Sequence, residues 1–251
     1  VILTHSETST GVINDLETIS SYIHEHQKAL SIIDCVTSLG ACNVPVDKWH
    51  LDIVASGSQK GYMIPPGLSF ISVSQKAWEA SEKSNLPKFY LNLKSYRKSL
   101  SSNSNPYTPA VNLVFALDES LKMMREEGLD NIFLRHNKHK LALSNAMKAL
   151  NLELFADEKH LSPSITAINT GEMDAEEFRK RIKNKYDILL AGGQDKLKGK
   201  IFRVGHLGYI NDRDIITIIS AISNVLLDSN KITTQDAGEA LLVASKYLTE
   251  E

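Results

Sequence analysis

This sequence contains little cysteine and no large excess of charge of either sign. Its 251 residues include only Cys35 and Cys42, so it can carry neither a framework of several disulfides nor a zinc site built from two cysteine pairs. The 28 Lys and Arg residues are balanced by 30 Asp and Glu residues, without a long basic run. Nucleic acids and anionic membranes select strongly basic surfaces, so neither class of partner is expected. A reducing cytoplasm is the expected location.

A long uninterrupted apolar run is also missing. The best candidate, residues 215–227, is interrupted by polar residues and is too short for a bilayer, which needs about 20 largely apolar residues. It is therefore predicted as a buried helix. The sequence does not begin with Met, and its first residues, Val-Ile-Leu-Thr, are typical of the middle of a strand. We therefore expect the chain to start partway through a longer product.

The histidines show no spacing typical of a metal site, so no metal ion is expected. His24 and His26, and likewise His136 and His139, are predicted to lie on helix surfaces. The two cysteines are predicted to pack as small apolar side chains. With 42% hydrophobic and 23% charged residues, the composition is that of an ordinary globular protein with a sizeable core.

Short apolar runs at 1–3, 32–36 and 51–55 are each followed by small and polar residues instead of a hairpin turn. Between the first two runs, apolar residues recur at steps of three and four, as on one helix face: Val12, Leu16, Ile19 and Ile23. Strands alternating with helices predict an α/β fold with a mostly parallel sheet. Ligands of such sheets lie outside the carboxyl ends of the strands, so the polar residues there are the first candidates for chemistry.

The rest of the chain divides near Gly128, where a helix that starts at residue 111 is predicted to stop. Before it we predict a strand, a helix and an irregular loop rich in Ser, Asn and Pro, at 68–73, 75–84 and 95–109. Residues 128–251 are predicted to form a compact α+β unit. Its helices are expected at 129–150, 175–185 with Asp174 as cap, 213–227 and 235–247, and its strands at 165–169, 188–190 and 201–205.

Lys60 and Asp34 are the residues that most strongly suggest chemistry. Lys60 lies in a turn of small residues, Ser-Gly-Ser-Gln-Lys-Gly at 56–61, after an apolar strand. Asp34 closes another apolar strand, where burial without a cationic partner would be costly. Pyridoxal phosphate needs an acidic or basic partner for its pyridine nitrogen and a lysine for its Schiff base. The alternative for Lys60 is a solvated surface loop.

Four ordered motifs resemble those of the class V pyridoxal-phosphate aminotransferases. They are HSETSTG at 5–11, DCVTSLG at 34–40, SGSQK at 56–60 and PPG at 65–67. The resemblance reaches about residue 227 and is greatest to alanine–glyoxylate, serine–glyoxylate and serine–pyruvate aminotransferases. Chains labelled as a small subunit of a soluble hydrogenase share the motifs. The resemblance implies pyridoxal phosphate as cofactor and the fold type I of these transferases. Residues 1–127 would be the remainder of the large cofactor-binding domain and 128–251 the small α+β domain.

The resemblance also implies roles at the cofactor. Lys60 would form the Schiff base and then move a proton between the substrate and the cofactor. Asp34 would pair with the pyridine nitrogen, and Val36 would pack against one face of the ring unless it is simply a core residue. Gln59 would contact the phosphate. Ser9 would donate toward the phenolic oxygen or the phosphate, or would cap a helix beginning near Gly11.

Three further residues are assigned in the same way. Thr108 and Tyr107 match the family segment that reaches the phosphate of a neighbouring subunit, which implies a homodimer. Arg203, in a strand that ends in glycine, matches the arginine that binds the substrate carboxylate; its alternative is a surface ion pair. The implied reaction is ping-pong transamination between alanine or serine and a 2-oxo acid such as glyoxylate or pyruvate.

The sequence departs from the family at its start. The resemblance implies roughly a further hundred residues there, with a glycine-rich phosphate loop and an aromatic residue that stacks on the cofactor ring. Two alternatives to transamination therefore stay open: a non-enzymatic or partner-dependent subunit of the hydrogenase-labelled type, and a cysteine desulfurase. The sequence argues against a cysteine desulfurase. The desulfurase pattern has His before the Schiff-base lysine and a cysteine late in the chain, whereas Gln59 precedes Lys60 here.

Overall fold

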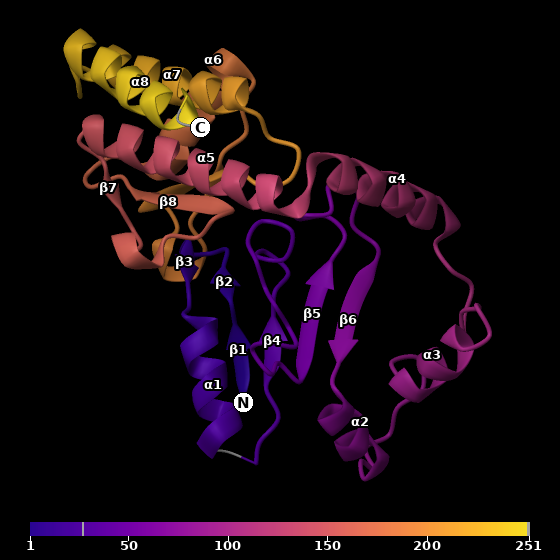
Figure 1. Ribbon diagram of the computed structural model, residues 1–251. Helices are drawn as coiled ribbons and strands as arrows, with labels where there is room; N and C mark the ends of the chain where they lie inside the picture. The colour runs from indigo at the N-terminus through magenta and orange to yellow at the C-terminus, as the bar shows by residue number, and fades with distance from the viewer. Residues whose placement is uncertain (27, 250–251) are drawn as a thin grey trace.

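The computed structural model describes residues 1–26 and 28–249, and its amino-terminal half is built on a four-stranded sheet (Figure 1). Along the sheet, β4 pairs in parallel with β1 and β5, and β6 runs antiparallel to β5. The predicted α/β fold with a mostly parallel sheet is therefore confirmed. In spatial order the strands are β1 (Ile2–Thr4), β4 (Ile32–Asp34), β5 (Ile53–Gly57) and β6 (Ser69–Val73).

One face of this sheet carries a small apolar core. Leu3, Ile33 and Val54 are aligned across the three parallel strands, and side chains of one register share a face. Leu16, at the start of α1 (Leu16–His26), packs with Ile33 and Val54. Burying each such side chain contributes about 1.5–3 kcal/mol. The helix α1 is thereby held against the sheet.

The predicted start of this helix near Gly11 is wrong. Gly11, with φ 70°, belongs to the turn between β2 (Ser6–Glu7) and β3 (Val12–Ile13), which pair as an antiparallel hairpin. Val12 also forms a bridge with Leu161. The three- and four-residue spacing is real, but pairing with nearby Glu7 and with distant Leu161 holds Val12 in a strand.

Three helices follow β6. The first, α2 (Gln75–Glu82), was predicted and is capped by Ser74, whose hydroxyl accepts from the Ala77 amide. The segment predicted as an irregular loop instead begins with α3 (Leu93–Leu100), capped by Asn92. The Ser, Asn and Pro residues that follow and punctuate this short helix hid it. The predicted helix from residue 111 is α4 (Val111–Glu127).

A second, antiparallel sheet forms the carboxyl-terminal half. Its order is β7 (Glu153–Leu154), β8 (Ile165–Asn169), β10 (Ile201–Gly205) and β9 (Ala191–Gly192). The structure confirms the predicted bounds of β8 and β10. The strand predicted at 188–190 is wrong, since the paired residues are Ala191 and Gly192.

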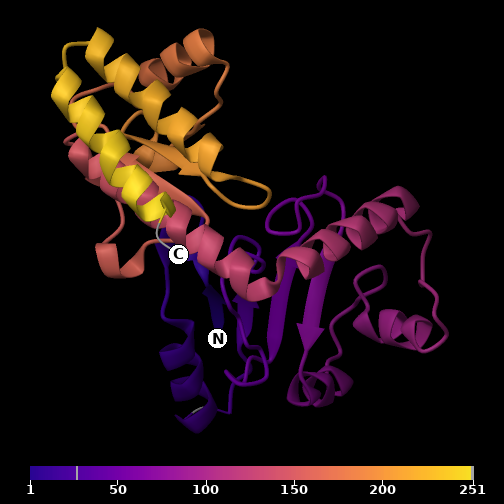
Figure 2. The same cartoon turned by 45° about the horizontal axis from the view of Figure 1, so that its top comes forward.

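Helices cover one face of this second sheet (Figures 1 and 2). The predicted cap of α6 by Asp174 is confirmed, because its carboxylate accepts from the Glu176 amide. The apolar run predicted as a buried helix is α7, with Ile215, Ile219 and Ile222 fully buried. The helices are α5 (Leu129–Ala149), α6 (Ala175–Tyr186), α7 (Asp212–Asp228) and α8 (Thr234–Thr249), with short 3₁₀ turns η1 (Glu158–His160) and η2 (Asp195–Leu197).

Two separate apolar clusters result. The first contains Leu16, Ile33 and Val54, and the second, larger one extends from α5 to α8 around Phe202. The first lies before Gly128 in the chain and the second after it. This distribution agrees with a domain boundary near Gly128, which stays a prediction. Within residues 1–26 and 28–249, no helix combines the length and apolarity that crossing a membrane requires.

The prediction that His136 and His139 lie on a helix surface is wrong. Both belong to α5 and are buried, and they lie near His206, the residue that follows β10. Burial lowers the pKa of His136 to about 4 and that of His206 to about 3. Both side chains are therefore neutral at pH 7. His24 and His26 are exposed, as predicted.

These buried histidines predict an acid-sensitive fold. An unfolded histidine titrates near 6.5, so between about pH 6.5 and pH 4 the unfolded chain binds more protons than the native one at His136. The free energy of unfolding should fall as the pH decreases through this window, by up to about 1.4 kcal/mol per pH unit for each such histidine. Urea unfolding at several pH values measures it.

In that experiment, His136→Gln should flatten the pH dependence. The matched control is His160→Gln at an exposed position, which should leave the slope unchanged. Equal slopes for the two variants would contradict the prediction.

Candidate active site

A cavity of about 430 Å³ lies where the two halves of the chain meet. Thr8, Thr37 and Lys60 line it from the first half, and Arg203 and Leu207 from the second. The cavity is thus at the carboxyl ends of β4 and β5, where the sheet type predicts a ligand site. It brings together Lys60, which is expected to form a Schiff base, and Arg203, which is expected to bind a carboxylate.

The turn that carries Lys60 is held by short contacts. Ser58 donates from its hydroxyl to the Pro65 carbonyl at 2.8 Å and accepts from the Leu68 amide at 3.1 Å. Gly61 packs directly on the backbone around Gly40; a Cβ built there would lie 2.3 Å from the Leu39 carbonyl oxygen. Only glycine fits at this position.

Lys60 itself is half-buried. Its backbone carbonyl accepts from the Met63 amide at 3.0 Å. Its Nζ forms no ion pair or hydrogen bond with the residues that the structure describes. A free amine in a cavity is available to attack a carbonyl group or to carry a proton.

Two threonine hydroxyls also line the cavity. Thr8 and Thr37 share a hydrogen bond of 2.6 Å and both line the cavity. Ser9, the predicted hydroxyl, instead donates to the Glu7 carboxylate from its hydroxyl at 2.6 Å and from its amide at 2.8 Å. These bonds lower the pKa of Glu7. Ser9 neither lines the cavity nor caps a helix.

The threonines were missed by sequence reasoning. Each lies next in the chain to a residue that was chosen, Ser9 and Val36 respectively. No local signal separates them from these neighbours, because both pairs lie in turns, where side chains do not follow the alternation of a strand.

Arg203 is buried, with 6% of its surface exposed, and makes no surface ion pair. Its Nε donates to the Gly192 carbonyl at 2.8 Å, and its Nη1 donates to the Thr8 carbonyl at 2.6 Å. Burial and the nearby Arg179 lower its pKa, while Glu7 opposes the shift. Nη2 has no partner within the described residues. This wall of the cavity therefore suits an anion such as a carboxylate.

Asp34 lies at the carboxyl end of β4, but the premise that it is buried is wrong. Its side chain is exposed, and Oδ1 accepts from the Val36 amide at 2.9 Å. Neither Asp34 nor Val36 lines the cavity, and Gln59 is exposed. The neighbouring Cys35 is buried, as predicted for a small apolar side chain.

Tyr107 and Thr108 lie apart from the cavity, between α3 and α4. The Tyr107 hydroxyl donates to the Phe89 carbonyl at 3.1 Å, and its ring contacts the rings of Phe89, Tyr90 and Tyr96. Thr108 is exposed. Their expected role toward a neighbouring subunit stays a prediction.

The thiols show no nucleophilic character. Burial raises the pKa of Cys35 to about 11 and that of Cys42 to about 12, so both are protonated at pH 7. In the part of the chain that the structure describes, no group of three or more His, Cys, Asp or Glu residues is arranged to hold a metal ion.

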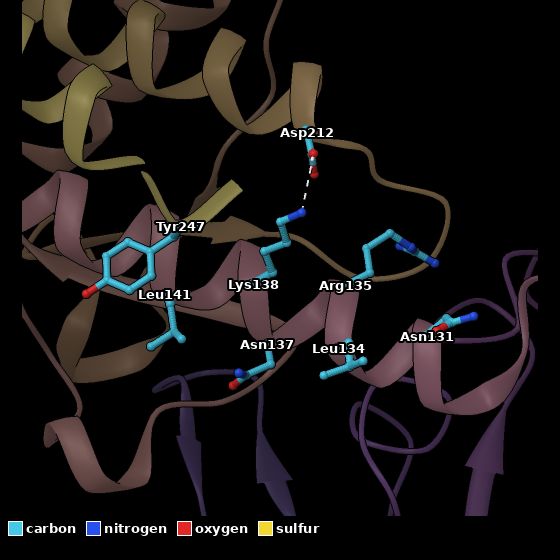
Figure 3. A pocket seen from close by; sticks show the side chains of 8 residues that line it. All are labelled: Asn131, Leu134, Arg135, Asn137, Lys138, Leu141, Asp212 and Tyr247. Carbon is cyan, nitrogen blue, oxygen red and sulfur yellow. Dashed lines mark ion pairs between the residues drawn. The ribbon is translucent and has the colours of Figure 1, made fainter. Parts of the chain in front are cut away.

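A second hollow of about 440 Å³ lies on the outer side of α5 (Figure 3). Lys138 points toward Asp212, 3.9 Å away, and Tyr247 of α8 closes one side. It contains neither Lys60 nor Arg203. The cavity between the two halves is therefore the candidate active site.

The family model described as aminotransferase class-V matches residues 1–226. A "Soluble hydrogenase 42 kDa subunit" of Anabaena cylindrica is 60% identical over 228 residues, which are 91% of this chain and 60% of that protein. A serine–glyoxylate aminotransferase of Arabidopsis thaliana is 32% identical over 252 residues, covering 99% of this chain and 62% of that protein.

Among solved structures, the ureidoglycine–glyoxylate aminotransferase of Bacillus subtilis aligns with a TM-score of 0.90 at 31% identity, covering 100% of this chain and 65% of that one. The chain thus spans less than two thirds of the length of these relatives. The cofactor of the matched family is pyridoxal phosphate, as the resemblance implied. The match over residues 1–226 establishes that this chain belongs to the class V aminotransferase family.

Proposed function

We propose that the protein transfers an amino group from a small amino acid, alanine or serine, to a 2-oxo acid such as glyoxylate or pyruvate. The observation that carries this proposal is that Lys60, from the first half of the chain, and Arg203, from the second, line one cavity. An amine and a carboxylate-binding guanidinium are what a transaminase must present to an amino acid. The kinetics should be ping-pong, because amino donor and oxo acceptor use the same site in turn.

The residues around the cavity fit pyridoxal phosphate in the chemistry of their donors. Lys60 offers an unpaired amine for the aldehyde. Asp34 does not line the cavity, but it ends β4 three residues before Thr37, which does, and it offers a carboxylate oxygen, Oδ2, that no described residue binds. Thr8 and Thr37 offer hydroxyl donors. The cofactor, when bound, accepts the electron pair that the substrate Cα–H bond leaves behind.

The chain's own residues supply the other parts of the reaction. Lys60 Nζ takes the proton from the substrate Cα and returns a proton later, a role typically worth 10²–10⁴-fold in rate. Arg203 orients the substrate through its carboxylate, which would bind Nη2 and compete with the Thr8 carbonyl for Nη1. Asp34 would bind the pyridine nitrogen, and Thr8 would take the donor role predicted for Ser9.

The remaining assignments stay part of the proposal. Val36 would contact the cofactor ring, Gln59 the phosphate, and Tyr107 with Thr108 the phosphate of a second subunit. The exposed positions of Gln59 and Thr108 leave them free for such contacts. A homodimer in the cytoplasm is the expected assembly and location.

Two other functions remain candidates from the family. A cysteine desulfurase needs a nucleophilic thiol, and the raised pKa values of Cys35 and Cys42, caused by burial, argue against those two residues. A partner-dependent subunit is suggested by the name of the Anabaena relative, a soluble hydrogenase subunit. The two models differ in one assay: the full-length protein alone, with cofactor, alanine or serine, and glyoxylate or pyruvate. We expect turnover without added partners.

Lys60→Ala should reduce transamination by at least about 10²-fold, because the proton carrier and the cofactor-attaching amine are lost together. Steady-state rates with glyoxylate as acceptor measure the effect. Lys83→Ala, at an exposed position, is the control and should keep normal turnover. Undiminished turnover in Lys60→Ala would exclude the assignment.

Asp34→Asn preserves the acceptor oxygen for the Val36 amide but removes the charge. Cofactor affinity should weaken by about tenfold, equivalent to about 1.4 kcal/mol, because the pyridinium loses its counter-charge. Equilibrium titration of apoprotein with pyridoxal phosphate measures it, with exposed Asp47→Asn as control. Unchanged affinity would show that Asp34 serves the turn alone.

Arg203→Lys keeps the positive charge but loses the planar fork. The KM values of amino and oxo acids should rise together by about 10- to 100-fold, because both bind through the same carboxylate. Exposed Arg213→Lys serves as control. A rise for only one of the two substrates would contradict a shared carboxylate site.

A further inference from the structure

Arg135 of α5 binds the segment that follows β10. Its Nη1 donates to the carbonyls of Gly208 and Ile210, at 2.9 and 3.0 Å. Its Nε and Nη2 donate to the two carboxylate oxygens of Glu127, the last residue of α4, at 2.6 and 3.0 Å. Figure 3 shows Arg135 pointing from α5 toward the loop that precedes α7. One guanidinium therefore connects the end of α4 to residues 208–210.

His136 holds the same segment from beside Arg135. Its Nε2 accepts from the Gly208 amide at 3.1 Å, so this nitrogen carries no proton. Its Nδ1 must then be the protonated nitrogen, and it donates to the Ile132 carbonyl at 2.7 Å. Both backbone groups of Gly208 are thus bound by adjacent residues of α5, its amide by His136 and its carbonyl by Arg135.

The segment held in this way touches both sides of the cavity. Gly205 and Leu207 line the cavity beside Arg203. Gly208 packs on the turn that carries Lys60; a Cβ at Gly208 would lie 3.3 Å from Met63 Cγ and 3.5 Å from the Lys60 carbonyl oxygen. The position of residues 205–208 therefore sets the distance between the Arg203 strand and the Lys60 turn.

The other side of the Lys60 turn is bound by α4. The Ser120 hydroxyl donates to the Tyr62 carbonyl. The pair of helices α4 and α5 thereby holds the Lys60 turn through Ser120 and the Arg203 side through Arg135. The Glu127–Arg135 ion pair, with side chains 31% and 20% exposed, crosses the junction between the two helices.

We propose that Arg135 is a positioning residue that sets the spacing between Lys60 and Arg203 and so determines how tightly the substrate carboxylate binds; this inference rests on the proposed transaminase function. Arg135 does not line the cavity. Its planar fork is required, since no single ammonium group can bind a carboxylate side-on and two carbonyls together.

The test compares Arg135→Gln, Arg135→Lys and Glu127→Gln in the full-length protein, with exposed Arg125→Gln on α4 as the matched control. Arg135→Gln should raise the KM values of the amino and the oxo acid together by about 10- to 100-fold, the scale of a misplacement near 1 Å. The affinity for pyridoxal phosphate should change by less than the KM values do, because the Ser120 hydroxyl still holds the Lys60 turn through the Tyr62 carbonyl. Arg135→Lys should not restore KM, and Glu127→Gln should shift it in the same direction by less.

A double variant separates positioning from a general loss of structure. Because Arg135 acts through Arg203, Arg135→Gln should add less than about threefold to KM in an Arg203→Lys background. Full multiplication of the two effects would overturn the proposal. An unchanged KM in Arg135→Gln would overturn it as well, and if that variant does not fold, an unchanged KM in Glu127→Gln does so.

Hydrogen–deuterium exchange gives a readout that needs no turnover. In Arg135→Gln, amides at 205–210 and at 60–63 should both exchange faster than in wild type, while Arg125→Gln leaves them unchanged. Faster exchange at 205–210 alone would show that the two segments are not coupled and would overturn the proposal. If the wild-type protein shows no transamination but Arg135→Gln still speeds exchange in both segments, the proposed function is refuted and the spacing role stands.

Discussion

The hydrogen bonds of Arg203 join two parts of the chain that have separate cores. The guanidinium is buried, and a buried charge without partners is costly, so it requires the carbonyls of Gly192 and Thr8. Hydrogen bonds to a charged group contribute about 1.5–3 kcal/mol each. One partner is in its own sheet, but the other is the turn after β2. The hairpin of β2 and β3 is therefore fastened to the second sheet, and the cavity lies beside this contact.

The same junction explains which elements could be predicted from sequence. The bounds of β8 and β10 follow from short apolar runs whose residues are buried on this sheet, and α7 follows from a long apolar run. The strand expected at 188–190 fails because Leu190 is buried in the larger core while pairing with β10 starts at Ala191. Apolarity predicts burial there, but the register depends on a distant partner strand.

The site shows the same limit at the level of single residues. Lys60 was predicted from its place after an apolar strand and Arg203 from the family resemblance, and the two share a cavity. Thr8 was not, because the choice between two adjacent hydroxyls depends on Glu7, whose carboxylate binds Ser9. His136 was expected on a helix surface because its partner, the Gly208 amide, lies far along the chain and leaves no signal in the nearby sequence. Local pattern indicates the chemistry, whereas long-range contacts decide which side chains reach the cavity.

The tight contact of Gly61 with the Leu39 carbonyl has a consequence for how related sequences can diversify. Any side chain at position 61 would overlap the backbone opposite, so the turn that presents Lys60 has almost no freedom to vary. The residues that the second half of the chain contributes are less constrained: Leu189 is 78% exposed and lines the same cavity with Gln194 and Leu207. In the proposed reaction, substitutions among these residues would change substrate preference while the turn that presents Lys60 keeps its place. Chemistry and specificity would thus evolve in separate segments of the chain.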